Sequence, residues 1–501
     1  MDAAVAATAE NHDPTNGPWT LPDGWAWAEA QSFADVVGGG TPSDAGDPAN
    51  FDADGVPWIT PADLSGFSGS SIRRGARSLS PTGLQRASTR MLPAGSVLIS
   101  SRAPVGYCVV AEGPVCTNQG FKSLRLKAPI DPFFIRYFVL YAKRRLNDAA
   151  SGTTFKELSG RAMEQIVFPL APLAEQRRIV ARVDALFAEI AEGEAALAAA
   201  RKGLDTFRRA LLKAAVSGEL TKDWRAANPA TETGRDLLLR LQKRHPNASP
   251  TRLGWKPKSE LPLLPKGWTW CAIEEAGEVQ LGRQRAPQHH DGDNMRPYLR
   301  VANVLENRLD FSDVKWMNFT PIEFETFALR PGDILLNEGQ APDLLGRPAM
   351  YRGEIVGCCF QKTLLRFRAR NGILPDYALI VFRHYMRSGR FKRESRITTN
   401  IGHLTQVRFV VMEFPLPPEA EQQVIVELFR EGEAAATDVL ALLDAEASDA
   451  ARLKQSILKT AFEGRLVPQD PADESASALL ALMAANPTTR RVRRGRARQN
   501  A

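Results

Sequence analysis

The chain has few cysteines and no cysteine pattern that would support a metal site or a disulfide framework. Its 501 residues include five cysteines, which is an odd number. None forms a CxxC pair or stands near a histidine at the spacing of zinc ligands. We therefore expect buried thiols in a reducing cytoplasm, and no metal.

The sequence also lacks the loops that mark many enzymes: it has no Walker A loop, no G-x-G-x-x-G loop and no HExxH pair. "DPFF" from Asp131 resembles the (D/N)PP(Y/F) loop of amino-methyltransferases without its second proline, and it fits a helix start better. "PGDILLNEGQ" from Pro331 resembles a nuclease PD…(D/E)-x-K pattern but has Gln340 where the lysine belongs. These absences predict no catalytic residue and no bound cofactor.

Long apolar runs are missing as well. No stretch approaches the roughly 20 apolar residues of a membrane-spanning helix. Residues 1–18 have neither a basic start nor an apolar run, so we expect no signal peptide. The composition, 44% hydrophobic and 24% charged, is typical of an ordered cytoplasmic protein. The formal charge of +7 favours a polyanionic partner.

What the sequence does contain is a long internal repeat. "LPDGWAWAEAQSFADVV" from Leu21 returns as "LPKGWTWCAIEEAGEV" from Leu264, and "FPLAPLAEQRRIV" from Phe168 returns as "FPLPPEAEQQVIV" from Phe414. One unit of roughly 240 residues is thus duplicated, which is far longer than a solenoid repeat. The segments between these anchors differ between the copies. We expect a constant frame that carries two unlike variable domains.

Each variable domain is expected to be compact and mainly β. "VPWIT", "GSVLISSR", "VGYCVVAEG" and "FKSLRL" are short apolar runs bounded by turn residues, as strands are. A helix is predicted from Asp131 to Leu146, and "PDYALIVFRHYMRSGRF" after Leu374 is its counterpart.

A long helix is predicted after each variable domain. Apolar residues then step alternately by four and three, which is typical of a coiled coil. A small domain cannot cover such a stripe, so we expect the two helices to pack on each other. Because the chain must return from the end of the first helix to begin the second domain, we expect them to run antiparallel, with the domains at opposite ends of a pseudo-twofold arrangement. The predicted seam is Ile179, Val183, Leu186, Ile190, Gly193, Leu197, Ala200, Leu204, Phe207 and Leu211 against Ile425, Phe429, Gly432, Ala436, Val439, Leu443, Glu446, Ala450, Leu453 and Ile457.

Polar side chains suited to nucleic acid gather in the predicted loops. Arg, Lys, Asn and Gln can pair with base edges, whereas hydroxyls and glycine amides suit phosphates. Ordinary turns and caps account for about half of such loops on general grounds. The candidates are Thr41, Ser43, Ser100, Ser101, Arg102, Asn118, Gln119, Lys122, Thr153, Thr154 and Lys156 in the first domain, and Arg283, Gln284, Arg285, Arg300, Asn303, Gln361, Lys362, Thr399, Asn400 and His403 in the second.

These motifs together resemble the specificity subunit of type I restriction-modification enzymes. In chain order they are "PWIT", "PAGSVLISSRAPVG", "TNQGF", "SGTTFKELS", "FPLAPLAEQRRIV" and "LLKAAVSGEL", with "FPLPPEAEQQVIV" and "ILKTAFEGRL" in the second copy. The resemblance runs from about residue 21 to 485. In the second domain "CCFQKTLLRF" stands in place of "TNQGF", so Gln361 and Lys362 alone carry it there.

The resemblance implies an α+β fold, in which two mainly β target recognition domains alternate with two long helices packed as an antiparallel coiled coil. It implies a non-catalytic subunit that reads a bipartite double-stranded DNA sequence. The implied partners are two methyltransferase subunits, which hold S-adenosylmethionine, and restriction/translocase subunits, with no membrane. The repeated "AEQ" suggests Glu175, Gln176, Glu421 and Gln422 as contacts of the methyltransferase subunits.

The expected boundaries follow from the repeat and the resemblance. They are a disordered leader at 1–20, target recognition domains at 21–172 and 264–418, spacer helices at 173–220 and 419–466, a connector at 221–263 and a basic tail at 467–501. The run "RRVRRGRAR" in that tail fits a solubilising segment and a non-specific phosphate contact equally well.

Two other classes of function fit the sequence less well. An enzyme that combines recognition with methylation needs a cofactor loop and a complete (N/D)PP(Y/F) loop, and the sequence has neither. A structural coiled-coil protein has no use for variable β domains with polar loops.

Overall fold

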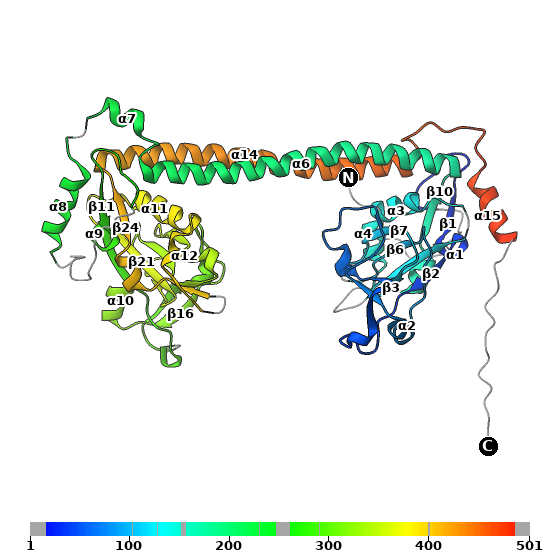
Figure 1. Ribbon diagram of the computed structural model, residues 1–501, viewed down its shortest axis with the longest axis horizontal. Coiled ribbons are helices and arrows are strands. Elements are labelled where there is room, and N and C mark those ends of the chain that lie inside the picture. Colours follow the sequence, from blue (N-terminus) through cyan, green and yellow to red (C-terminus); the bar gives the residue numbers. More distant parts are fainter. Residues whose placement is uncertain are drawn as a thin grey trace, which may run out of the picture. The chain divides into compact units, whose positions relative to one another are not determined.

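The computed structural model describes residues 17–102, 104–127, 129–151, 157–229, 231–246, 261–289, 291–398 and 401–485. The chain forms two compact units (Figure 1). Unit 1 comprises residues 1–196 and 446–501, and unit 2 comprises residues 197–445. The first and the last described residues of the chain therefore belong to the same unit. Of the helices in the described part of the chain, none has the length and apolar character that a membrane crossing requires.

Unit 1 is built around a five-stranded sheet of order β2-β9-β6-β7-β4 and a three-stranded sheet of order β5-β3-β8. Antiparallel pairing of β1 with β10 closes the domain beside the long helix that follows. The elements are β1 (Ala26–Glu29), α1 (Ala30–Phe33), β2 (Ala34–Gly38), β3 (Phe51–Ile59), β4 (Ser71–Ile72), β5 (Arg77–Leu79), α2 (Pro81–Ala87), β6 (Val97–Ile99), β7 (Cys108–Ala111), β8 (Cys116–Thr117), β9 (Lys122–Leu126), α3 (Pro132–Tyr141), α4 (Lys143–Asp148), α5 (Gly160–Glu164) and β10 (Val167–Leu170).

Unit 2 repeats this order for four of the five strands of the main sheet and for the three strands of the second sheet. Its main sheet runs β12-β21-β17-β19, its second sheet β16-β13-β20, and β11 pairs with β24 as β1 pairs with β10. The elements are β11 (Thr269–Ala272), α9 (Ile273–Ala276), β12 (Gly277–Leu281), β13 (Met295–Leu299), β14 (Val304–Leu305), β15 (Arg308–Leu309), β16 (Lys315–Asn318), α10 (Pro321–Phe327), β17 (Ile334–Asn337), β18 (Gly339–Gln340), β19 (Pro348–Met350), β20 (Cys359–Phe360), β21 (Leu364–Ala369), α11 (Pro375–Arg387), α12 (Arg390–Glu394), β22 (Arg396–Thr398), β23 (Ile401–His403), α13 (Gln406–Val410) and β24 (Glu413–Leu416).

The α+β fold class predicted from the sequence is confirmed. Strands form at the predicted apolar runs, and helices begin at Pro132 and Pro375, where the proline suits the first turn. The first of these helices breaks at Ala142 into α3 and α4 instead of continuing to Leu146. All five cysteines are free and buried. Burial raises the pKa of the Cys116 thiol to about 11, as expected of a structural thiol.

Two long helices follow the domains, α6 (Leu173–Ser217) and α14 (Glu419–Phe462). Within unit 1, Lys454 of α14 donates to Glu194 of α6. Within unit 2, Arg201 contacts Asp444 and Arg208 contacts Thr437. In unit 2 the position along α14 falls as the position along α6 rises, so the helices pair antiparallel, as predicted.

The seam differs from the predicted one at three of the ten positions on each helix. Gly193, Ala200 and Phe207 are exposed, and the neighbouring residues Glu194, Arg201 and Arg208 reach across to α14 instead. The same shift of one residue occurs on α14, where Val439, Glu446 and Leu453 are exposed and the adjacent residues Leu440, Ala447 and Lys454 are half-buried. On α6 a pattern of apolar residues misses these positions, because the residues that reach α14 there are charged.

The segments after the long helices also correspond in the two units. In unit 2, α7 (Lys222–Ala227) and α8 (Gly234–Arg244) follow α6, and the Gly234 amide donates to the Gly267 carbonyl oxygen. In unit 1, α15 (Ala476–Ala485) follows α14, and the Ala476 amide donates to the Gly24 carbonyl oxygen.

The predicted terminal segments are therefore wrong in part. Residues 476–485 of the expected basic tail form α15, and its apolar side chains pack against the core of unit 1. At the other end, the indole of Trp19 in the expected leader donates to the Phe462 carbonyl oxygen. Residues 1–16 and 486–501, with the run of arginines, lie outside the described residues.

Two glycines of the long helices predict opposite effects of alanine on stability. A Cβ at Gly203 meets nothing within 4 Å, whereas a Cβ at Gly432 would lie 2.7 Å from Cδ2 of Leu211. We expect Gly203→Ala to raise the free energy of unfolding by about 0.5–1 kcal/mol through helix propensity. Gly432→Ala should lower it, because Leu211 must move. Urea denaturation of both variants measures the difference, and an equal gain in both would contradict the close approach at Gly432.

Candidate nucleic-acid interface

In unit 1 four loops meet at one end of the main sheet. The amide of Gly40, after β2, donates to the Thr117 carbonyl oxygen, and the amide of Ser101, after β6, donates to the Gly120 carbonyl oxygen. The amide of Leu158 in turn donates to the Ser101 carbonyl oxygen. We call the surface formed by residues 39–43, 100–102, 117–122 and 157–158 the first loop face. It brings together the described candidates that the sequence placed in four separate motifs.

Unit 2 builds the same surface with the same backbone hydrogen bonds. The Arg283 amide donates to Phe360, the Glu338 amide to Thr363 and the Leu404 amide to Glu338, each to a carbonyl oxygen. We call the surface formed by residues 282–285, 338–340, 361–363 and 401–404 the second loop face.

A glycine makes each loop face possible. A Cβ at Gly39 would lie 2.0 Å from the Asn118 carbonyl oxygen, and a Cβ at Gly282 would lie 2.3 Å from the Gln361 carbonyl oxygen. Backbone atoms cannot move aside for a side chain as a flexible group can, so only glycine fits at these two positions. The loop after the first strand of the main sheet can therefore lie directly on the loop that carries Asn118 or Gln361.

Several predicted residues present polar groups at these surfaces. Ser43, Gln119, Gln284, Arg285 and Lys362 are exposed, and Thr41, Arg102, Asn118, Lys122, Gln361 and His403 are partly exposed. Lys122 Nζ lies 3.5 Å and Arg102 Nη1 lies 3.8 Å from the carboxylate of Glu157, a residue that the sequence analysis did not select. In unit 2, His403 Nδ1 lies 3.5 Å from the carboxylate of Glu338, which it also did not select. Thr153, Thr154, Lys156, Thr399 and Asn400 lie outside the described residues.

Other predicted residues have internal roles, contrary to the expectation from sequence. Ser100 is buried, donates to the Pro104 carbonyl oxygen and accepts from the Tyr107 amide. The Ser101 side chain is fully buried.

Two candidates of the second domain are likewise held inside unit 2, and a third is ion-paired near its surface. Arg283 is 7% exposed, pairs with Glu323 and lies over the ring of Phe319. Asn303 is buried and donates to the carbonyl oxygens of residues 310 and 313, and Arg300 pairs with the Asp313 carboxylate. Arg283 and Asn303 therefore shape the loops rather than offer groups to a ligand, whereas the Arg300 side chain is 30% exposed.

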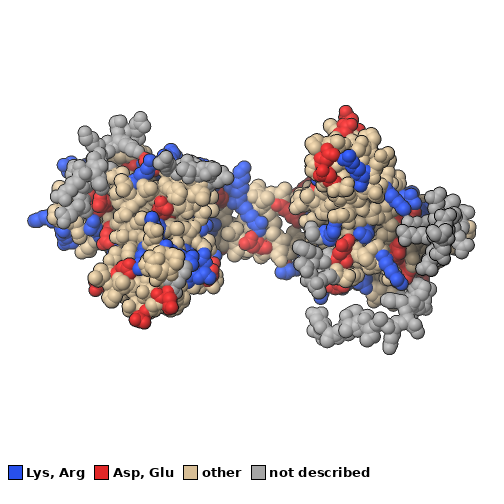
Figure 2. All heavy atoms as spheres, turned by 90° about the horizontal axis from the view of Figure 1, so that it is seen from below, with Lys and Arg blue, Asp and Glu red and all other residues tan. Residues whose placement is uncertain are grey.

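The charges seen in the view of Figure 2 are mixed. Lys and Arg lie among Asp and Glu on both units, without one continuous basic patch. On the face that this view shows, phosphates would meet individually placed cations rather than a continuous basic surface.

The "AEQ" residues predicted to bind a partner are buried inside their own units. The Trp25 indole donates to Glu175, and the Trp268 indole donates to Glu421, at 3.0 and 2.9 Å. Burial raises the pKa of the Glu175 carboxyl, since desolvation outweighs the stabilising indole contact. Glu421 also accepts from Thr221 and Arg225.

The neighbouring glutamines bind a second helix of each domain. We call the Trp–Glu contact and the glutamine contact of each unit its buried joint. Gln176 accepts from the Asp131 amide and Gln422 from the Leu374 amide, both at helix starts. The prediction that these four side chains contact a methyltransferase subunit is not supported, because they are at most 1% exposed and bind the domain that precedes each long helix.

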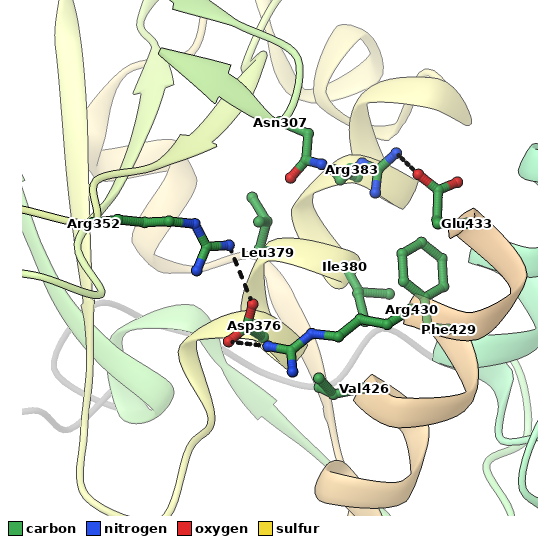
Figure 3. A pocket seen from close by; sticks show the side chains of 10 residues that line it. All are labelled: Asn307, Arg352, Asp376, Leu379, Ile380, Arg383, Val426, Phe429, Arg430 and Glu433. Carbon is green, nitrogen blue, oxygen red and sulfur yellow. Dashed lines mark hydrogen bonds and ion pairs between the residues drawn. The ribbon is translucent and has the colours of Figure 1, made fainter. Parts of the chain in front are cut away.

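A charged pocket lies elsewhere in unit 2, between α11 and α14 (Figure 3). Arg352 and Arg430 both point at Asp376, and Arg383 pairs with Glu433. Since these cations already have acidic partners, the pocket fixes α11 on α14 and contributes nothing to the second loop face.

Comparison with known proteins adds the family context. The model of the type I restriction modification DNA specificity domain matches residues 22–198. The chain is 31% identical over 177 residues to the MjaIX specificity subunit from Methanocaldococcus jannaschii, a match that covers 35% of this chain and 40% of the relative. It is 25% identical over 420 residues to the StySPI specificity subunit from Salmonella potsdam, covering 80% of this chain and 82% of the relative.

A solved structure shares the fold along most of the chain. It is described under complex assembly and conformational transition of the type I R-M system, and the similarity has a TM-score of 0.62 at 18% identity. It covers 90% of this chain and 100% of that chain.

The buried joints predict a stability effect in the isolated chain. Glu421→Ala leaves the Trp268 indole and the Arg225 guanidinium without their acceptor, so we expect the free energy of unfolding of unit 2 to fall by about 3 kcal/mol or more. Glu427→Ala on the exposed side of the same helix is the control, expected to stay within about 0.5 kcal/mol. Thermal unfolding checks both, and an unchanged Glu421→Ala chain would restore the partner-binding interpretation.

Proposed function

Because this chain belongs to the specificity subunits of type I restriction-modification systems, we propose that it reads a bipartite target in double-stranded DNA and scaffolds the other subunits. Each loop face would read one half of the target. Methylation and cleavage would be carried out by separate subunits, and S-adenosylmethionine would be bound by the methyltransferase. We propose the cytoplasm as its compartment, in keeping with its five free, buried cysteines.

The observation that carries this proposal is the pair of loop faces. Both units hold the same four loops with equivalent backbone hydrogen bonds, yet the side chains that they present differ. Asn118 and Gln119 in unit 1 correspond to Gln361 and Lys362 in unit 2, since the Asn118 amide donates to Ile59 as the Gln361 amide donates to Leu299. A common frame with different side chains is what two readers of different sequences require.

The side chains of the loop faces suit direct readout. Asn and Gln can form two hydrogen bonds with adenine, and Arg or Lys can donate to guanine, in the major groove. Arg102, Gln119, Gln284 and Lys362 offer such groups at or near the surface. Thr41 and Ser43 have the hydroxyls that suit phosphates, which position the protein without reading sequence.

The long helices supply the scaffolding surface in this proposal. Phe207, Val439 and Leu442 in unit 2 are 45%, 44% and 66% exposed, and Leu453 in unit 1 is 51% exposed. Apolar side chains at this exposure on a helix are suited to a partner's helices. We propose two methyltransferase subunits as these partners, with restriction/translocase subunits joining through them.

Exchange of one recognition domain tests the proposal. Replacing residues 21–168 by the corresponding domain of another specificity subunit should change one half of the methylated sequence and leave the other half unchanged, because unit 2 keeps its own loop face. Methylation mapping with a methyltransferase subunit and S-adenosylmethionine measures the result. If both halves change together, or the chain methylates DNA by itself, the proposal is wrong.

Lengthening the helices tests whether they set the distance between the half-sites. Four residues inserted after Ala200 and four after Glu446 add about 6 Å to each helix and turn it by slightly more than one revolution. At about 3.4 Å per base pair, the preferred gap should grow by one or two base pairs. Methylation of a library of gap lengths checks this. A folded, active variant with an unchanged gap would exclude the helices as the ruler.

A further inference from the structure

Glu338 is an acidic residue in the second loop face. It follows β17 directly, its backbone amide donates to the Thr363 carbonyl oxygen, and its own carbonyl oxygen accepts from the Leu404 amide. In unit 1 the equivalent residue is Ser101, held by the same two hydrogen bonds to Gly120 and Leu158. The backbone position is therefore the same in both units, and only the side chain differs.

The two side chains have different surroundings. Ser101 is fully buried, whereas the longer Glu338 side chain is 20% exposed, so the frame does not require an acid at this position. Among the described residues, the ion pair found for its carboxylate is His403 Nδ1 at 3.5 Å, which is longer than a good hydrogen bond. The carboxylate can therefore still accept further hydrogen bonds.

Chemically compatible groups surround Glu338. Gln361 and Lys362 lie on the adjoining loop, and β23 carries His403 and the 51% exposed Ile401 at alternate positions of one strand, so both point to the same side. A carboxylate is repelled by phosphates, so Glu338 is not suited to a contact with the DNA backbone. The donors beside it can instead bind other groups of the same base pair. A carboxylate accepts well from the exocyclic N4 amino group of cytosine in the major groove.

We propose that Glu338 is a specificity-determining residue that selects cytosine at one position of the half-site read by unit 2. The inference rests on the proposed function and adds to it the chemistry of one base contact. Unit 1 has no acid at the equivalent place, so the requirement applies to one half-site alone.

The test uses the full chain assembled with methyltransferase subunits and a DNA library randomised at the half-site of unit 2. Glu338→Ala should reduce the preference for cytosine at one position by about 5- to 150-fold, the effect of losing one base contact. Glu338→Gln should shift that position toward adenine, because a carboxamide pairs with adenine N6 and N7. Glu354→Gln is the control; it lies beyond β19, at the opposite end of the sheet from the loop face, and should change nothing.

Failure of the proposed function and failure of the role of Glu338 give different results in this experiment. If neither half-site is selected by the unmodified complex, the proposed function fails. If both half-sites are selected, three results would each overturn the role of Glu338. These are an unchanged preference in both variants, an equal loss on all sequences, and a change confined to the other half-site. Thermal unfolding of both variants, which remove the same charge with different side chains, distinguishes a folding defect from lost readout.

Discussion

The buried contact between a tryptophan indole and a glutamate is the interaction on which the architecture depends. In unit 1 it joins Trp25 to Glu175, and in unit 2 it joins Trp268 to Glu421. Each contact locks the start of a domain to the first turn of the helix that follows it. A glutamine one residue later holds the start of a second helix. The direction in which each long helix leaves its domain is thereby fixed.

The Trp–Glu contact is the same in both units, whereas the side chains of the loop faces differ between them. Backbone hydrogen bonds and a single glycine set the position of these loops in both units, although the side chains at equivalent positions differ. Asn118 in unit 1 corresponds to Gln361 in unit 2, and Ser101 corresponds to Glu338, with equivalent backbone hydrogen bonds at both positions. The contacts that hold each long helix on its domain are thus separate from the loop face, as the proposed reading of two different sequences requires.

The sequence predicted the repeat, the α+β class and the antiparallel helices, because each depends on periodic patterns or on turn residues. It misplaced part of the seam, since Lys454 and Glu194 pair across the two helices and an apolar pattern does not register charged residues. It also assigned the repeated Glu and Gln of "AEQ" to a partner, because repetition cannot distinguish a buried joint from a docking surface. Glu338 and Glu157 were missed because their significance depends on which loops meet in space.

The central claim is that each unit reads its own stretch of DNA. Base-resolution mapping of methylation by the unmodified complex, on a fully random DNA library, tests it most directly. The account predicts two short defined segments separated by a gap of constant length in which every base is tolerated. One continuous defined segment, or two segments at variable separation, would contradict it.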